Sequence, residues 1–193
     1  MIVKLSELSL EQKQRFVTVF GESFFDMIDK KGKNMKKLQV VFGDAFLPQF
    51  AYAYLDGEDV AGLITCSNSQ SSAMCFSKSV CKSQFGSILG AINYRFFKSL
   101  FGKPFAKADD EGYIDFLCVD SGHRRRGIAT KLMNHVYAQT QFKHYLLAVL
   151  AKNSGAIKLY KKEGYTIIRD VKELIVRIAI NDYTHVMLYS KTK

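Results

Sequence analysis

The residue types best suited to chemistry lie in one short stretch, where an apolar run ends and an amphipathic run begins. Residues 113–119 predict a strand that stops at Asp120. A predicted helix opens just after it, and the residues around its start are Arg124, Arg125, Arg126, Gly127, Ile128, Ala129 and Thr130. The first backbone amides of a helix have no partner within the helix, and the N-terminal end of the helix dipole is positive. A glycine there lets an anion approach the backbone closely, and neighbouring arginines add positive charge. This stretch predicts a pyrophosphate-binding loop, which points to a phosphate-bearing cofactor and an enzyme.

Two motifs together resemble a known family. The first, Arg124-x-x-Gly127-x-Ala129, is similar to the Arg/Gln-x-x-Gly-x-Gly/Ala signature of the GNAT acetyltransferase superfamily. The second, Asn153-x-x-Ala156-x-x-x-Tyr160-x-x-x-Gly164-Tyr165, resembles its Asn-x-x-Ala-x-x-x-Tyr-x-x-x-Gly-Phe/Tyr segment. A helix and a strand separate the motifs, as the family requires. The resemblance covers residues 112–190 well and the N-terminal half by element order only. Taken alone, the first motif could be a solvated arginine-rich turn.

The resemblance implies a mixed-sheet α/β fold (α+β) in a single domain that spans residues 1–193. Strands are predicted at 2–5, 49–55, 60–66, 113–119, 145–150, 165–171 and 184–189. Helices are predicted at 9–28, 35–46, 127–141 and 154–163. The sequence departs from the family before the cofactor-binding strand, where a tight hairpin is replaced by a mostly helical insertion of about residues 69–107.

The resemblance also implies roles for individual residues, with acetyl-CoA as the co-substrate. In the family the strand matching residues 113–119 splays from its neighbour. Its backbone, here at Leu117, Cys118 and Val119, then pairs with the pantetheine arm, and one amide polarises the acetyl carbonyl. Tyr160 matches the tyrosine that protonates the departing thiolate, although it could instead pack its helix on the sheet. Asn153 either caps its helix or hydrogen-bonds the CoA arm.

The general base that must deprotonate the amine is less defined. Asp115 and Tyr113 are two residues apart on one predicted strand, so they share a face. Some family members carry a glutamate at the position of Tyr113, and that residue type is missing here. Asp115 on a buried strand would have a raised pKa and could serve as the base. Asp115 could instead pair with a basic neighbour, and a chain of water molecules could serve as the base.

Composition narrows the partners and the compartment. The net charge of +10 suggests an anionic partner such as CoA phosphates, an acidic substrate, nucleic acid or a membrane surface. The four cysteines form no Cys-x-x-Cys pair and the four histidines show no metal-ligand spacing, so no metal is expected. No membrane span or signal-peptide h-region is found, which favours a cytoplasmic protein.

Two further features could contact the acceptor or a partner. Lysines gather in the segment between the first two predicted helices, at Lys30, Lys31, Lys33, Lys36 and Lys37. This run is either a solvated loop or a wall of the acceptor site that attracts an anionic acceptor. The Phe-rich insertion is interpreted as a helical lid or a homodimer surface. Basic residues interleave with its phenylalanines, which leaves a membrane or nucleic-acid surface as the alternative.

The sequence therefore predicts an acetyl-CoA-dependent N-acetyltransferase that acts on a primary amine, on a small molecule or peptide, by direct transfer in a ternary complex. One alternative is a catalytically silent CoA-binding sensor or scaffold, supported by the missing glutamate. The other is a basic RNA- or ribosome-binding module, although no recognisable nucleic-acid motif is present and nucleic acid is not the expected partner.

Overall fold

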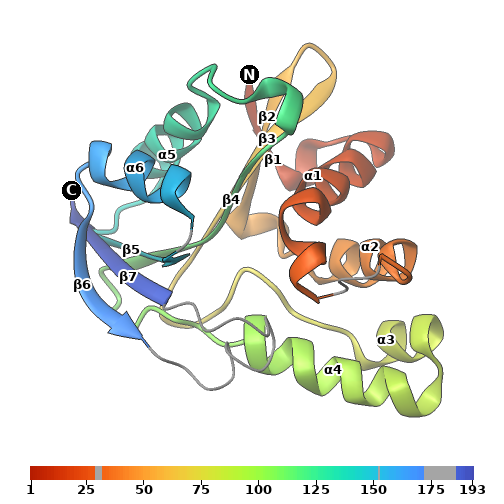
Figure 1. Ribbon diagram of the computed structural model, residues 1–193. Helices are drawn as coiled ribbons and strands as arrows, with labels where there is room; N and C mark the ends of the chain where they lie inside the picture. Colours follow the sequence, from red (N-terminus) through yellow and green to blue (C-terminus); the bar gives the residue numbers. More distant parts are fainter. Residues whose placement is uncertain (29–31, 152, 172–185) are drawn as a thin grey trace.

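A mixed seven-stranded sheet forms the centre of the computed structural model, which describes residues 1–28, 32–151, 153–171 and 186–193 (Figure 1). The strand order is β1-β2-β3-β4-β5-β7-β6, and only β4 and β5 pair in parallel. The strands are β1 (Ile2–Lys4), β2 (Ala51–Asp56), β3 (Asp59–Ser67), β4 (Glu111–Val119), β5 (His144–Leu150), β6 (Thr166–Val171) and β7 (Val186–Thr192). The helices are α1 (Leu10–Ile28), α2 (Met35–Ala45), α3 (Lys78–Phe85), α4 (Ser87–Phe101), α5 (Ile128–Gln139) and α6 (Ser154–Lys162). The predicted mixed α/β fold and its element order are confirmed. Residues 184 and 185 of the last predicted strand lie outside the described residues.

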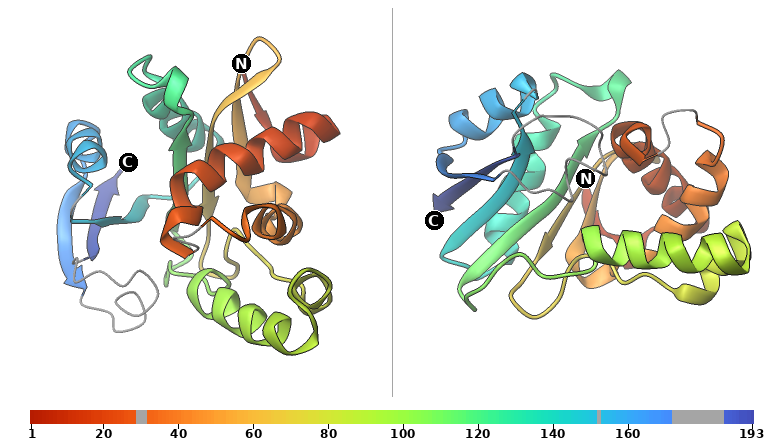
Figure 2. Two further views of the ribbon diagram at one scale, coloured as in Figure 1. Left: turned by 45° about the vertical axis from the view of Figure 1, so that its right-hand side comes forward. Right: turned by 60° about the horizontal axis from the view of Figure 1, so that its bottom comes forward.

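Two hydrophobic cores cover the two faces of the sheet (Figure 2). The core under α1 to α4 is rich in phenylalanine, and Phe20 lies at its centre with ring centroids 5.0 Å from Phe116 and 5.1 Å from Phe46. The core under α5 and α6 contains several buried tyrosines, including Tyr145 and Tyr160. Burial of apolar surface on both faces holds β3 and β4, the central strands, in a fixed position.

Side-chain caps start the helices α1 and α6 at the positions predicted from the sequence. The Gln12 amide donates to Ser9 Oγ at 3.2 Å, and the Ser9 amide donates to Gln12 Oε1 at 3.0 Å. This reciprocal pair is the predicted capping box at the start of α1. The Asn153 side chain accepts from the Ala156 amide at 3.1 Å and caps α6 in the same manner.

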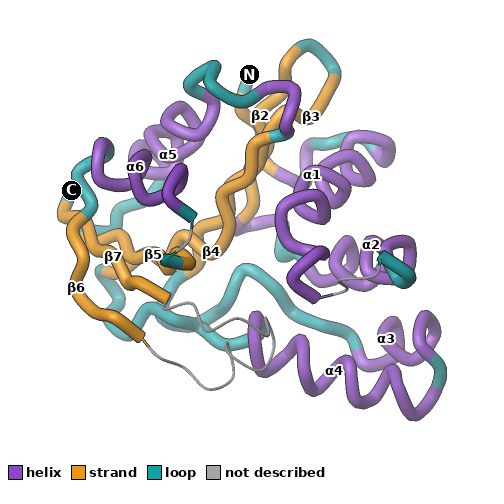
Figure 3. The backbone as a smooth tube through the Cα atoms, viewed as in Figure 1, coloured by secondary structure: helices purple, strands orange, loops and turns teal. Residues whose placement is uncertain are grey.

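The insertion between β3 and β4 contains two successive helices, α3 and α4, with loops on either side (Figure 3). The two helices meet at Gly86, whose φ of 82° an L side chain rarely adopts. They pack closely at Gly90, where a Cβ would lie 2.4 Å from the Lys82 Cα. Phe97 of α4 lies against Phe42 of α2 at 5.2 Å between ring centroids. The insertion therefore extends the α1–α2 layer, and only part of residues 69–107 is helical.

Candidate active site

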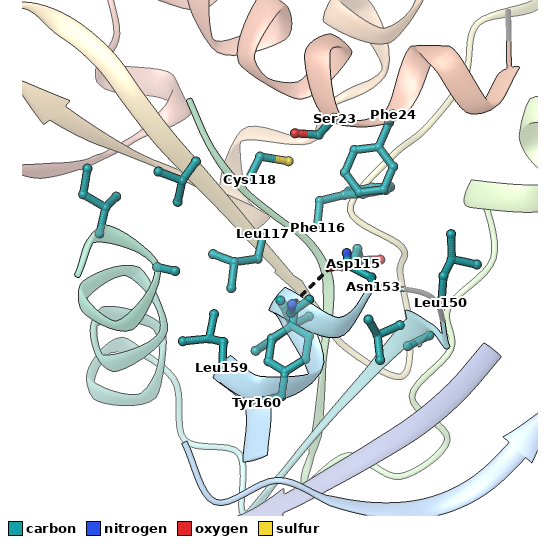
Figure 4. Close-up of a pocket in the computed structure, with 18 of the residues that line it drawn as sticks. Ser23, Phe24, Asp115, Phe116, Leu117, Cys118, Leu150, Asn153, Leu159 and Tyr160 are labelled. Carbon is teal, nitrogen blue, oxygen red and sulfur yellow. Dashed lines mark hydrogen bonds between the residues drawn. The ribbon is translucent and has the colours of Figure 1, made fainter. Parts of the chain in front are cut away.

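The strands β4 and β5 diverge and leave a cavity between them. Their parallel ladder joins Glu111–Ile114 of β4 to His144–Leu147 of β5 and ends there, although both strands continue. Beyond it, Leu117 and Leu150 line a cavity of about 1000 Å³. In Figure 4, Ser23 and Phe24 approach this cavity from α1, while Leu159 and Tyr160 approach from α6. On the side toward β5, the backbone groups of β4 beyond Ile114 therefore face the cavity instead of a neighbouring strand.

A β-bulge at Asp115 changes the face of the sheet on which the neighbouring β4 side chains lie. The pairing with β3 shifts from Thr65↔Phe116 to Cys66↔Ile114, so Asp115 is an extra residue on β4. Phe116 consequently belongs to the core under α1, whereas Ile114 belongs to the core under α5. Both Tyr113 and Asp115 line the cavity. The bulge re-aims the strand at the point where the ladder to β5 ends.

The carboxyl group of Asp115 lies in a poorly solvated environment. Desolvation raises its pKa to about 7, opposed by hydrogen bonds from Ser67 and Ala73. The Ser67 amide donates to Asp115 Oδ2 at 3.2 Å. A carboxylate with a pKa near neutrality can take up a proton from an amine or water at physiological pH. The predicted pairing with a basic neighbour is not among the contacts of Asp115 in the described residues.

The loop before α5 forms the opposite end of the cavity. Gly127 adopts φ 74° as the N-cap residue of α5, and Arg125 adopts φ 63°. Arg124 Nε donates to the Val119 carbonyl at 3.2 Å, which keeps this arginine against the end of β4. The first amides of α5 have no intrahelical acceptor and point out of the helix end. The predicted loop residues that line the cavity are Arg124, Arg125, Gly127, Ile128, Ala129 and Thr130.

Arg126 is the one predicted loop residue that the structure directs elsewhere among the described side chains. Its Nη1 donates to Asp56 Oδ2 at 3.2 Å, in the turn between β2 and β3. The side chain is 59% exposed and does not line the cavity. Thr130 lines the cavity, and its hydroxyl donates to Glu163 Oε1 at 2.7 Å. The cavity end of the loop thus presents two arginines and the backbone of a helix start.

An ion-pair network around Asp120 holds this loop, and the sequence analysis did not find it. Asp120 accepts from Arg15 at 2.7 Å, from the Gly122 amide at 3.0 Å and from His123 Nδ1 at 2.8 Å. The hydrogen bond from His123, followed by the one from Arg15, holds the pKa of Asp120 below its usual value. Arg15 also donates to Asp59 at 3.0 Å. An aspartate followed by Ser-Gly is a signal for a side-chain-capped turn, but nothing local identifies Arg15.

Tyr160 projects from α6 and lines the cavity (Figure 4). It is 8% exposed, and burial raises the pKa of its phenol, so the phenol is protonated at neutral pH. Cys118 lies across the cavity beside Ser23, and burial raises the pKa of its thiol to about 12. That thiol is therefore neutral and no nucleophile at neutral pH. Asn153 serves as the helix cap and also lines the cavity, so both predicted positions of its side chain are compatible.

The remaining end of the cavity is assembled from distant segments. Glu22 and Phe24 come from the C-terminal part of α1, while Lys103 and Phe105 follow α4. The Phe105 ring stacks on Tyr113 at 4.5 Å between centroids. The insertion thus contributes side chains to this wall. Among the lining residues that the structure describes, the acidic ones are Glu22 and Asp115.

The expected lysine wall is not found at this end. Lys33, Lys36 and Lys37 are exposed and do not line the cavity, and Lys37 Nζ lies 5.7 Å from the Phe85 ring centroid of α3. Lys30 and Lys31 lie outside the described residues. Lys33 precedes α2, Lys36 and Lys37 lie in its first turn, and Lys37 lies beside α3. An anionic acceptor therefore loses its main support.

Neither a metal site nor a membrane-spanning helix is found in the part of the chain that the structure describes. In the described ranges, no group of three or more His, Cys, Asp or Glu side chains is placed to hold a metal ion. None of the helices in these ranges is both long and apolar enough to cross a membrane.

Comparison with known proteins identifies the family. A family model described as "Acetyltransferase (GNAT) family" matches residues 29–165, most of the chain, and the protein therefore belongs to this family of acetyltransferases. No curated protein matches the sequence. The fold is similar to an N-acetyltransferase from Staphylococcus aureus Mu50, at 20% identity and a TM-score of 0.65, over 99% of this chain and 100% of that one.

Two further solved structures share the fold. One is the NatC complex bound to Gag peptide and CoA, at 15% identity and a TM-score of 0.58, over 100% of this chain and 98% of that one. The other is Ard1 from Thermoplasma volcanium, at 15% identity and a TM-score of 0.56, over 100% and 96%.

Proposed function

We propose that this protein transfers an acetyl group from acetyl-CoA to a primary amine, directly and within a ternary complex. The observation that carries the proposal is the single cavity, which joins a helix-start anion site at Gly127 to the splayed backbone of β4 and then to Asp115. A structural neighbour with this fold, the NatC complex, is bound to CoA, which supports CoA as the ligand of the same cavity here.

The anion site and the splayed strand would hold the donor substrate. The amides at the start of α5, with Arg124 and Arg125, are suited to the pyrophosphate. The unpaired backbone of Leu117, Cys118 and Val119 can hydrogen-bond the pantetheine arm and polarise the acetyl carbonyl. Side chains of Ile128, Ala129 and Thr130 lie beside this path. Asn153 extends it on the α6 side.

Two side chains have the protonation states that the reaction needs. Asp115, as the carboxylate, accepts the proton that the amine loses as its nitrogen bonds to the acetyl carbon. Tyr160, as the neutral phenol, gives its proton to the sulfur as the carbon–sulfur bond breaks. A bound ammonium first loses one proton to solvent, so that the neutral amine attacks. The products are the amide and free CoA thiol; Asp115 then releases the proton it accepted to solvent, and Tyr160 takes one back from solvent. Burial raises the pKa of both groups, which brings the carboxyl group toward the range of a base and keeps the phenol protonated as an acid.

We further propose that the acceptor carries a cationic amine next to an apolar group. Glu22 and Asp115 attract the ammonium form, while Phe24 and the stacked Phe105–Tyr113 pair give apolar surface. This arrangement replaces the anionic acceptor that the lysine-rich segment suggested. The whole chain acts as one domain in this proposal, since strands from both halves line the same cavity.

A free-CoA release assay across an amine panel tests the function. The panel contains polyamines, aminoglycosides, amino acids and protein N-terminal peptides, with acetyl-CoA binding measured in parallel by calorimetry. Release with at least one amine, dependent on Asp115 and Tyr160, supports the enzyme. Tight acetyl-CoA binding without release across the panel would favour the sensor or scaffold instead. Affinity for RNA without acetyl-CoA binding would favour the RNA-binding module.

A further inference from the structure

The N-terminal half of α4 exposes large aliphatic side chains. Ile88, Leu89 and Ile92 are 78%, 62% and 55% exposed. At 100° per residue they lie on the side of the helix opposite Gly90 and Phe97, which are buried against α3 and α2. The helix is thus apolar on its packed face and on its outer face. A patch of this kind marks a contact surface rather than scattered exposure.

Exposed basic residues lie on the same two helices, α3 and α4, and neither helix carries an acidic residue. The sequence from Val60 to Ala108 contains six basic residues and no aspartate or glutamate. Exposed members are Lys78 and Lys82 on α3, with Arg95 and Lys98 on α4. We call the exposed side chains Ile88, Leu89, Ile92, Arg95 and Lys98 of α4, together with Lys78 and Lys82 of the adjoining α3, the basic-apolar patch. The charge of the patch calls for an anionic partner.

The patch lies away from the cavity and on the periphery of the molecule. Figure 1 and Figure 2 show α3 and α4 at the edge of the α1–α2 layer, with the start of α4 farthest from β4. The other end of α4 lines the cavity through Leu100 and Phe101. At 1.5 Å per residue, Ile88 is about 20 Å along the helix from Phe101. A partner on the patch would therefore leave the opening of the cavity free.

We propose that the basic-apolar patch docks on an anionic lipid surface. The aliphatic side chains would enter the boundary between headgroups and acyl chains, and the surrounding lysines and arginine would contact lipid phosphates. A second copy of the chain fits less well, because a symmetric contact would place Lys78, Lys82 and Arg95 against their own copies with no acidic residue on the insertion to pair them. A nucleic acid would use the charge but leave exposed isoleucines and leucine without a role.

Tryptophan fluorescence gives a direct test, because the chain contains no tryptophan. Ile92→Trp places one reporter in the patch, and Leu10→Trp places a matched reporter on α1, where Leu10 is 76% exposed. Vesicles of phosphatidylcholine with about one-third phosphatidylserine should shift the Ile92→Trp emission to shorter wavelength, and 0.5 M salt should reverse part of this shift. Pure phosphatidylcholine vesicles should not shift it, nor should either vesicle shift Leu10→Trp. An unchanged emission for Ile92→Trp, or equal shifts at both positions, would overturn the proposal.

Substitutions in the native background separate the lipid surface from other occupants. Vesicle partitioning should fall at least about 10-fold for Ile88→Asn/Ile92→Asn and about 10-fold for Lys78→Glu/Lys82→Glu. The control Lys13→Glu/Lys158→Glu changes the same charge on exposed sites of α1 and α6 and should partition normally. Unchanged acetyl-CoA binding shows that each variant is folded.

Loss of vesicle partitioning caused by the lysine changes alone, together with RNA binding, would indicate nucleic acid. Concentration-dependent mass that disappears in Ile88→Asn/Ile92→Asn, without vesicle binding, would indicate a dimer. Either outcome overturns the proposal.

Discussion

The two ends of the cavity are built by different means. At the end beside α5, backbone amides and two arginines come from one continuous segment, residues 120–130, which an ion-pair network fastens to α1. At the end beside α1, the wall is made of side chains from α1, the segment after α4, and β4, and it includes the aromatic rings of Phe24, Phe105 and Tyr113. The first end can recognise a fixed group by its backbone. The second can change its specificity by single side-chain substitutions while the fold is kept.

The largest effect is expected for a change at the α5 end. Gly127→Glu should raise the acetyl-CoA dissociation constant more than about 100-fold, about 2.7 kcal/mol, because a carboxylate would occupy the place of the pyrophosphate. Isothermal calorimetry measures the constant, and the rise in Tm on adding acetyl-CoA should disappear. Gly57→Glu is the matched control, since Gly57 has φ 63° in the β2–β3 turn and lies outside the cavity. Normal affinity in a folded Gly127→Glu protein would contradict the location of the anion site.

The junction of the two ends is tested at Tyr160. Tyr160→Phe should lower kcat about 100-fold, the lower bound of typical general-acid contributions, and leave acetyl-CoA affinity nearly unchanged. Tyr165→Phe is the control, because it loses the 2.9 Å hydrogen bond to Tyr137 and about 1 kcal/mol of stability without touching the cavity. Steady-state kinetics with saturating acetyl-CoA gives both values. If Tyr160→Phe and Tyr165→Phe have equal turnover, Tyr160 only packs its helix.

The acceptor end should show a distinctive pH dependence through Asp115. With a pKa of about 7, kcat/KM for the acceptor should rise through that pH, and Asp115→Asn should remove this limb and lower the plateau about 10-fold. The same group affects stability. Its folded pKa lies above the unfolded value of about 4, so the folded state holds an extra proton between about pH 4 and 7 and loses stability as the pH rises there.

Asp115→Asn should therefore flatten the fall in Tm over that window, and Asp109→Asn, an exposed carboxylate that accepts from Ser69, should not. A water chain acting as the base would leave the pH profile of Asp115→Asn like that of the parent. An unchanged stability profile would show that the carboxyl group is better solvated than its contacts with Ser67 indicate.

The contrast between the ends explains what the sequence could predict. The helix starts at Ser9 and Asn153 and the loop before α5 depend on residues a few positions apart, and each was predicted in the right place. The bulge at Asp115 depends on register with Thr65 of β3, so the sequence of β4 alone does not contain it. The aromatic wall and the position of the lysines on the α3 side likewise depend on how α4 packs against α2. Such contacts arise from tertiary packing, which local periodicity does not encode.

The smallest effect is expected for Arg15, whose ion pairs connect α1 to the loop before α5. Arg15 of α1 bridges Asp59 and Asp120, so Arg15→Met should loosen the loop before α5 and raise the acetyl-CoA dissociation constant about 5-fold, with kcat nearly unchanged. Arg15→Lys should recover only part of the affinity, because one ammonium cannot span both carboxylates as the guanidinium fork does. Lys13→Met removes a neighbouring charge from the exposed side of α1 and serves as the control. A lower Tm with unchanged affinity would mean that Arg15 stabilises the fold without positioning the loop. A weaker affinity that the lysine variant partly restores would establish that the loop must be held from α1, so that the α1 wall and the anion site act as one unit.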